Sequence, residues 1–124
     1  MVELLYTLFN IENVIGECLM DKLYICVLDS FPDYMTPTLV AHAVLRHHCN
    51  NFMFDERYEC WLEHSFRKCV VRVNQKEFDK IRKLPNVTES FENNTLNGEV
   101  SCLTIIAETN EHNVLKFAKL WKPL

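Results

Sequence analysis

The stretch from Lys22 to His48 constrains the fold more than any other part of the chain. Residues 22–28 form an almost unbroken run of apolar, β-favouring side chains, and Asp29 ends it. Such a run is typical of a central strand that is covered on both faces. Pro32 then interrupts the pattern, because proline cannot extend a β-ladder. The stretch therefore predicts a buried strand followed by a sharp loop.

A helix is predicted directly after this loop. Thr36 is a favourable N-cap, and Pro37 suits the first helical position, where its missing N–H has no helical partner to lose. The helix continues from Thr38 to His48 and ends in the segment 49–51. In α/β proteins, a site usually lies where a strand leads through a loop into a helix. We therefore expect the functional site at the carboxyl end of the first strand.

The rest of the chain alternates predicted helices and strands. The expected elements are a helix from Glu56 to about His64, a strand over 67–73, a helix that begins with an Asn74/Glu77 capping box, strands over 87–91 and 101–107, and a final helix over 111–120 that Asn110 caps. Asn97-Gly98 signals a two-residue hairpin. Two helices between the first two strands favour a parallel pair with a right-handed crossover. The order β-α-α-β-α-β-β-α predicts one compact α/β domain over residues 20–124.

Residues 1–19 precede this domain as an N-terminal extension, either a helix or an extra strand. They are apolar, but polar residues such as Asn10 and Glu12 interrupt them, which argues against a membrane span. An exposed apolar extension is also suited to contact a second copy of the chain, so a homodimer is possible on this pattern.

The six cysteines of the chain are expected to be reduced. Cys26, Cys69 and Cys102 each lie in an apolar strand-like run, where a free cysteine behaves as a small hydrophobic residue. The N-terminus contains Glu3 and has no basic residue before Lys22, so it does not resemble a signal peptide. Both observations indicate a cytoplasmic protein.

Charge is unevenly distributed along a chain whose formal net charge is −4. Acidic residues dominate the first 33 positions, and basic residues dominate positions 67–83. The candidate RNA-binding residues in this basic segment are Arg67, Lys68, Lys76, Lys80 and Lys83. A basic patch on an acidic protein suits an anionic partner such as tRNA. The alternative is an ordinary solvated helix face.

Three stretches carry a resemblance to a known family. They are residues 22–28 followed by 39–43, Trp61-Leu62 followed by 67–73, and residues 101–107 followed by Lys119-Leu-Trp121. In this order and spacing they resemble the peptidyl-tRNA hydrolase 2 family over residues 22–124. The resemblance implies a four-stranded mixed β-sheet with helices on both faces. It also implies hydrolysis of the ester that joins a peptide to the 3′ end of tRNA.

The chain departs from that family at the catalytic positions. The family's first helix carries a Lys, then a Gln four residues later and a His three beyond, and these positions correspond to Thr38, His42 and Leu45. The family's Asp after the third strand corresponds to Glu92, and its Thr in the fourth strand falls beside Thr104. A neutral threonine cannot replace the charge of the lysine at an oxyanion. Two functions therefore stay open, a divergent peptidyl-tRNA hydrolase and an inactive protein- or RNA-interaction module.

His42 is the candidate general base for water attack on an ester. Glu92 could orient it, and Thr38 or backbone N–H groups at the helix start could face the oxyanion. The alternatives are a helix histidine that bonds a backbone carbonyl and a solvated loop carboxylate.

Histidines and cysteines that could ligate zinc cluster in the sequence at His47, His48, Cys49, Cys60 and His64. Cys60 and His64 share a helix face, but the chain lacks the Cys-x-x-Cys spacing typical of zinc sites. Cys49 has no assured basic partner that would activate it as a nucleophile. We therefore expect neither a metal nor a cofactor.

Overall fold

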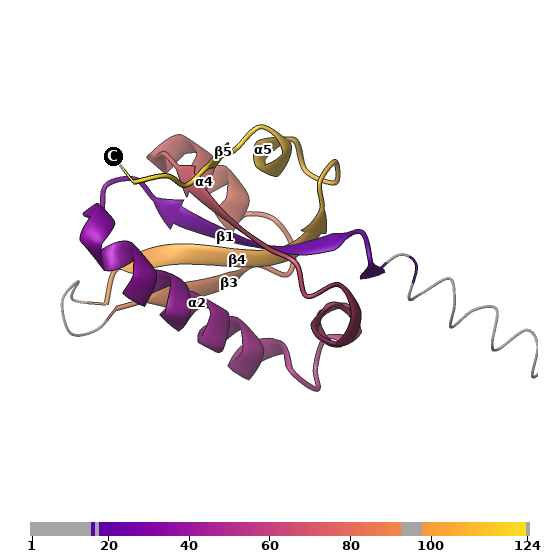
Figure 1. Ribbon diagram of the computed structural model, residues 1–124. Coiled ribbons are helices and arrows are strands. Elements are labelled where there is room, and N and C mark those ends of the chain that lie inside the picture. The colour runs from indigo at the N-terminus through magenta and orange to yellow at the C-terminus, as the bar shows by residue number, and fades with distance from the viewer. Residues whose placement is uncertain (1–15, 17, 93–97, 124) are drawn as a thin grey trace, which may run out of the picture.

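A mixed β-sheet organises the fold (Figure 1). The computed structural model describes residue 16, residues 18–92 and residues 98–123. Within these residues the strands are β1 (Asp21–Leu28), β2 (Lys68–Val73), β3 (Thr88–Phe91), β4 (Val100–Glu108) and β5 (Lys119–Leu120), and they form one five-stranded sheet in the order β3-β4-β1-β2-β5. β1 pairs in parallel with β2 and antiparallel with β4, and β3 and β5 pair antiparallel with β4 and β2. The α/β class and the mixed sheet are confirmed, whereas the expected number of four strands omitted β5.

Helices cover both faces of this sheet (Figure 1). α2 (Thr36–Asn51) and α3 (Glu56–Cys60) lie on one face, and α4 (Gln75–Arg82) and α5 (Asn113–Lys116) lie on the other. Asn74 and Glu77 form the expected capping box at the start of α4. None of the helices among the described residues is long and apolar enough to cross a membrane.

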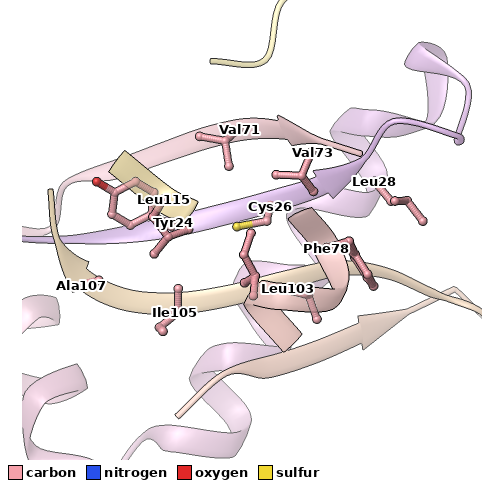
Figure 2. Packing of buried hydrophobic residues seen from close by; sticks show 11 residues of the cluster. Tyr24, Cys26, Leu28, Val71, Val73, Phe78, Leu103, Ile105, Ala107 and Leu115 are labelled. Atoms are coloured by element: carbon pink, nitrogen blue, oxygen red, sulfur yellow. The ribbon is translucent and has the colours of Figure 1, made fainter. Parts of the chain in front are cut away.

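β1 is buried on both faces, as its apolar run predicts. Its side chains alternate between two hydrophobic clusters. Leu23, Ile25 and Val27 pack with α2 and α3, whereas Tyr24, Cys26 and Leu28 pack with α4 and α5. Figure 2 shows the second cluster, in which Leu28 is the most exposed of these β1 side chains at 7%. Burial of this kind stabilises a fold by roughly 1.5 to 3 kcal/mol for each large aliphatic side chain.

The start of α2 differs from the expected N-cap at Thr36. A 3₁₀ turn, η1 (Asp33–Met35), leads directly into the helix, so Met35 occupies the cap position and contributes no side-chain bond. The backbone N–H of Thr36 donates to the Asp33 carbonyl instead. Because the turn already satisfies this donor, a capping hydroxyl is not needed, and Thr36 is buried.

The second predicted helix is shorter than expected. Asp55 caps α3 by accepting bonds from the backbone N–H groups of Arg57 and Tyr58. After Cys60 the chain widens into a π-helical turn, η2 (Trp61–Ser65), so the regular helix does not continue to His64. The N–H of Phe66 donates to the carbonyl of Trp61 and closes the turn. Phe66 has a positive φ of 54°, which ends the helical path.

The predicted C-terminal helix over 111–120 is wrong in its second half. α5 ends at Lys116, and the chain then pairs with the edge of β2 as β5. The N–H of Trp121 donates to the Val70 carbonyl, which extends this pairing. A four-residue helix is marginal by itself, whereas an unpaired sheet edge offers ready backbone partners. Edge pairing therefore overrides the helical pattern.

The predicted two-residue hairpin at Asn97-Gly98 lies partly outside the described residues. Asn97 lies outside the described residues, but β3 ends at Phe91 and β4 begins only at Val100. The N–H of Gly98 donates to the Glu92 carbonyl, and Gly98 has a positive φ of 78°. Most of the predicted extension over 1–19 also lies outside the described residues.

A disulfide joins Cys18 to Cys60, so the expectation that every cysteine is reduced is wrong. The two Cα atoms lie 5.9 Å apart, within the range that a disulfide spans. This pair could not be predicted from the sequence, because 42 positions separate the two cysteines. The packing of α3 against the start of β1 brings them together. Cys26, Cys69 and Cys102 are free, as expected.

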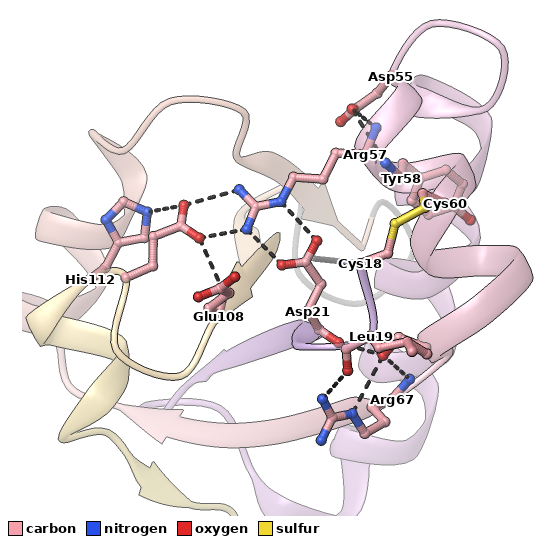
Figure 3. Close-up of polar contacts among 12 residues, drawn as sticks. Cys18, Leu19, Asp21, Asp55, Arg57, Tyr58, Cys60, Arg67, Glu108 and His112 are labelled. Atoms are coloured by element: carbon pink, nitrogen blue, oxygen red, sulfur yellow. Dashed lines mark hydrogen bonds and ion pairs between the residues drawn. A yellow bond between two sulfur atoms is a disulfide. The ribbon is translucent and has the colours of Figure 1, made fainter. Parts of the chain in front are cut away.

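An ionic network reinforces the same end of the sheet (Figure 3). Arg57 makes two hydrogen bonds to Asp21 and two to Glu111. The Asp21 side chain is only 5% exposed, so its charge depends on this partner. The hydrogen bonds from Arg57 also lower the pKa of Glu111 to about 2. The network ties the start of β1, α3 and the segment after β4 together.

We predict that Arg57→Ala lowers the free energy of unfolding by roughly 2 to 3 kcal/mol. The substitution leaves the buried Asp21 carboxylate unpaired, and the loss stays below that of a fully buried pair because the Arg57 side chain is 42% exposed. Arg82→Ala is the control, since the Arg82–Glu89 pair is exposed on both sides and should contribute under about 1 kcal/mol. Urea unfolding of both variants measures the difference, and equal losses would contradict the role of Arg57.

Candidate functional site

A cleft lies between α2 and the edge strand β3. Its volume is about 410 Å³, which is within the usual range for small-ligand sites. The lining residues are His42, Leu45, Arg46, Cys49, Ser90, Phe91 and Glu92. The first four occupy one face of α2 at helical spacing, and the last three follow one another at the end of β3. The cleft is therefore the place where a helix face meets a strand end.

Three consecutive residues at the end of β3 line the same cleft, namely Ser90 and Phe91 of the strand and Glu92 directly after it. Successive side chains of a regular strand point to opposite faces of the sheet. The pairing of β3 with β4 shifts register between Ser90 and Phe91. The unpaired residue of this irregularity is Ser101 of β4. Ser90, Phe91 and Glu92 all contribute to the lining, although regular alternation would place Phe91 on the face of α4.

His42 and Glu92 form a close pair inside this cleft. The His42 Nε2 atom lies 2.6 Å from Glu92 Oε2, across 50 positions of sequence. The Glu92 side chain is 9% exposed, whereas that of His42 is 48% exposed. β3 runs in the same direction as β1, because both are antiparallel to β4, so Glu92 lies at the carboxyl edge of the sheet. The structure therefore brings His42 and Glu92 together at this edge, and their role as a functional site stays a prediction.

The direction of this hydrogen bond determines the chemistry of His42. An ionised carboxylate accepts hydrogen bonds and cannot donate them, so Nε2 carries the proton in the neutral imidazole. The lone pair is then on Nδ1, which is the atom able to accept a proton from water. A half-exposed imidazole held by a buried carboxylate is the arrangement expected for general-base catalysis.

Arg46 is a cleft residue that the sequence analysis missed. It is exposed, and its guanidinium carbon lies 4.9 Å from the centroid of the Phe91 ring. The spacing from His42 to Arg46 is four residues, which places both on one helix face and could have identified Arg46 from sequence. The partnership with Phe91 could not have been found in that way, because it joins α2 to β3 through the packing of the folded chain.

Thr38 lies one turn before His42 but is not among the residues that line the cleft. It is exposed to solvent at the start of α2. Backbone donors there are also scarce, since the N–H of Thr36 already bonds Asp33 and Pro37 has none. Leu45, by contrast, lines the cleft with an exposed side chain.

A buried polar layer supports α2 beneath the cleft. His47 Nδ1 lies 2.8 Å from Thr104 Oγ1, and Asn51 Nδ2 donates to Thr88 Oγ1. His47 is 1% exposed, and its Nε2 has no hydrogen-bond partner among the described residues. Burial lowers the pKa of His47 to about 4, so the ring is neutral at physiological pH. Thr104 thus positions the helix and does not reach the cleft.

The basic residues proposed for tRNA lie apart from the cleft. Lys76, Lys80 and Lys83 are exposed along α4, on the sheet face opposite α2 (Figure 1). Arg67 and Lys68 are exposed at the start of β2, which is the opposite edge from Glu92. Both also make local contacts. Arg67 donates to the Leu19 carbonyl, and Lys68 donates to the Phe66 carbonyl and lies over its ring.

The residues considered for zinc do not converge. Cys60 is in the disulfide, and among the described residues no group of three or more His, Cys, Asp or Glu side chains could hold a metal ion. His48 Nδ1 bonds the Tyr58 hydroxyl at 2.7 Å. Cys49 is a free, exposed thiol in the cleft.

Comparison with known proteins adds no relative. No protein-family model matches the chain, and a search of the curated proteins finds no match. The chemistry of the cleft is therefore the basis for assigning a function.

We predict that acid destabilises the protein through His47. Its pKa is about 4 in the folded protein and 6.5 as the ordinary value, so in this window only the unfolded chain takes up the proton. Stability should consequently fall as the pH drops from about 6.5 towards 4, by about 2 kcal/mol between pH 7 and pH 5. Urea unfolding at the two pH values measures this loss.

The His47→Phe variant should lose this part of the pH dependence, because it removes the titrating group and keeps a ring in the core. His64→Phe is the control, since His64 is exposed, and it should behave as the wild type does. An unchanged pH dependence in His47→Phe would show that other groups cause the acid sensitivity.

Proposed function

We propose that this protein is a divergent member of the peptidyl-tRNA hydrolase 2 family that hydrolyses the ester between an acyl or peptidyl group and the 3′ end of tRNA. The His42–Glu92 pair in the cleft is the observation that carries this proposal. The topology supports it as well, since β1 to β4 form the mixed sheet with helices on both faces that the resemblance implies.

In the proposed reaction His42 acts as the general base. Glu92 accepts the Nε2–H bond and holds the imidazole, and Nδ1 takes a proton from the water that attacks the ester carbonyl. The leaving group is the ribose hydroxyl of the terminal nucleotide. Ester hydrolysis needs a positive group or N–H donors near the developing oxyanion, and Arg46 is the cationic residue of the cleft lining. We assign this charge to the N–H edge of the Arg46 guanidinium, in place of the family's lysine, and Thr38 and the backbone N–H groups at the start of α2 stay as the other proposed donors.

We predict that His42→Ala lowers the rate of ester hydrolysis by about 100-fold or more, because it removes the general base. Release of the acyl group from N-acetyl-aminoacyl-tRNA measures the rate. Glu92→Gln should reduce the rate by a smaller factor, because the amide can hold the ring but carries no charge.

His64→Ala is the matched control, since it removes an exposed histidine remote from the cleft, and it should leave the rate unchanged. Equal rates for the wild type and His42→Ala would remove His42 from the mechanism. A wild-type rate no higher than that of buffer would favour the alternative, an inactive interaction module that keeps the fold.

Binding of tRNA should depend on the lysines of α4. We predict that the triple variant Lys76→Glu, Lys80→Glu, Lys83→Glu abolishes tRNA binding at low salt and that wild-type binding weakens steeply with salt, because phosphate contacts release counterions. Lys116→Glu is the control for net charge, as this lysine is exposed on α5. Filter binding over a salt series measures both effects, and retention of tRNA by the triple variant would refute this surface.

A second candidate function is a protein-interaction module. Leu19 and Met20 are 49% and 59% exposed, and they lie directly before β1. Together with the apolar sequence before them, they suit contact with a second chain, such as another copy of this protein. A dimer by sedimentation, combined with no hydrolysis and no tRNA binding, would favour this function over the first.

A further inference from the structure

Arg46 and Phe91 form a stacked pair whose position suggests what the cleft recognises. The guanidinium lies over the face of the ring at 4.9 Å from its centroid, and both residues line the same cleft as His42 and Glu92. Phe91 is half-buried and Arg46 is exposed, so the arginine forms the outer layer of the stack. The guanidinium of Arg46 is therefore accessible to a ligand that enters the cleft.

The position of the Arg46–Phe91 pair suits the binding of a ligand. The Phe91 ring lies within cation–π distance of Arg46 on α2, and both residues line the cleft. Within the part of the chain that the structure describes, Arg46 has no ion pair with an acidic side chain. Its guanidinium is thus not committed to a carboxylate and stays available to a ligand.

The chemistry of the pair fits a nucleobase. Unpaired bases of single-stranded RNA are bound by stacking on aromatic rings and on planar arginine guanidinium groups. A lone phosphate would instead be held by several cations or N–H donors, and Arg46 is the single arginine or lysine among the lining residues. The flat surface that Arg46 presents therefore favours a base over an isolated anion.

We infer that the Arg46–Phe91 stack binds the terminal nucleobase of an RNA 3′ end. The inference rests on the proposed function in one respect, because it explains how the scissile ester is held. The acyl ester is attached to the ribose of that same terminal nucleotide, so a stacked base keeps the ester beside His42. Arg46 is one helical turn from His42, and Phe91 is adjacent to Glu92 in the chain.

Two oligoribonucleotides whose 3′ ends carry no acyl group test this inference, because neither contains an ester that could be cleaved. One ends in adenosine, and the other has the same length and phosphates but ends in an abasic ribose. The wild type should bind the first about tenfold more tightly, which corresponds to about 1.4 kcal/mol of stacking. The phosphate contribution is the same for both probes, so their ratio isolates the base. Fluorescence anisotropy of the full chain measures both affinities.

Arg46→Lys keeps the charge but loses the planar group, and Phe91→Leu keeps the apolar bulk but loses the ring. Each should reduce the tenfold ratio to about one while changing affinity for the abasic probe by less than about twofold. The matched controls are Arg82→Lys and Phe54→Leu, which alter an exposed arginine of α4 and an exposed phenylalanine outside the cleft. Both controls should keep the ratio.

Equal binding of the two probes by the wild type, no binding of either, or a ratio that survives in both cleft variants would overturn the inference. These outcomes are separable from those of the hydrolysis assay. A base preference without ester hydrolysis would leave the stack as an RNA-end site and reject the enzyme. Hydrolysis without a base preference would keep the enzyme and reject the stack.

Discussion

The whole structure depends on the burial of β1 on both faces. A strand of this kind needs a layer of helices on each face and a paired strand on each edge. The fold provides both layers and both paired strands. α2 and α3 cover one set of side chains, α4 and α5 cover the other, and β2 and β4 pair with the two edges. Because β2 is parallel to β1, the connection between them must cross over, which brings α2 across the face of the sheet next to β3. The cleft is a product of that crossover.

The two ends of the sheet have different physical characters. At the carboxyl edge the described ion pairs are His42 with Glu92, where His42 is half-exposed and Glu92 buried, and Arg72 with Asp33. At the opposite edge Arg57, Asp21 and Glu111 form a bidentate network, and Cys18 is bonded to Cys60 (Figure 3). A covalent crosslink is thus found at the edge away from the cleft. Residues at the carboxyl edge are correspondingly free to be selected for what they bind.

The parts of this molecule that sequence predicts are those governed by local pattern. The apolar run of β1, the capping box at Asn74 and the placement of His42 and Glu92 at one edge all follow from periodicity, capping chemistry and strand direction. The missed features depend on competition between distant segments. β5 forms because an open edge of β2 accepts it, and Phe91 of β3 lies beside Arg46 of α2, 45 positions away in the sequence. No local propensity encodes either outcome.

The bond between Cys18 and Cys60 has a consequence for the integrity of the chain. It turns residues 18–60 into a closed covalent ring that contains β1 and α2, and hence His42 and Arg46. The apolar turn that contains Met53 and Phe54, which are 76% and 84% exposed, lies inside this ring and is accessible to a protease. A single cut there opens the ring without dividing the molecule. The cleft residues on α2 then stay covalently attached to β3 and Glu92, and the two pieces separate only when a thiol reduces the disulfide.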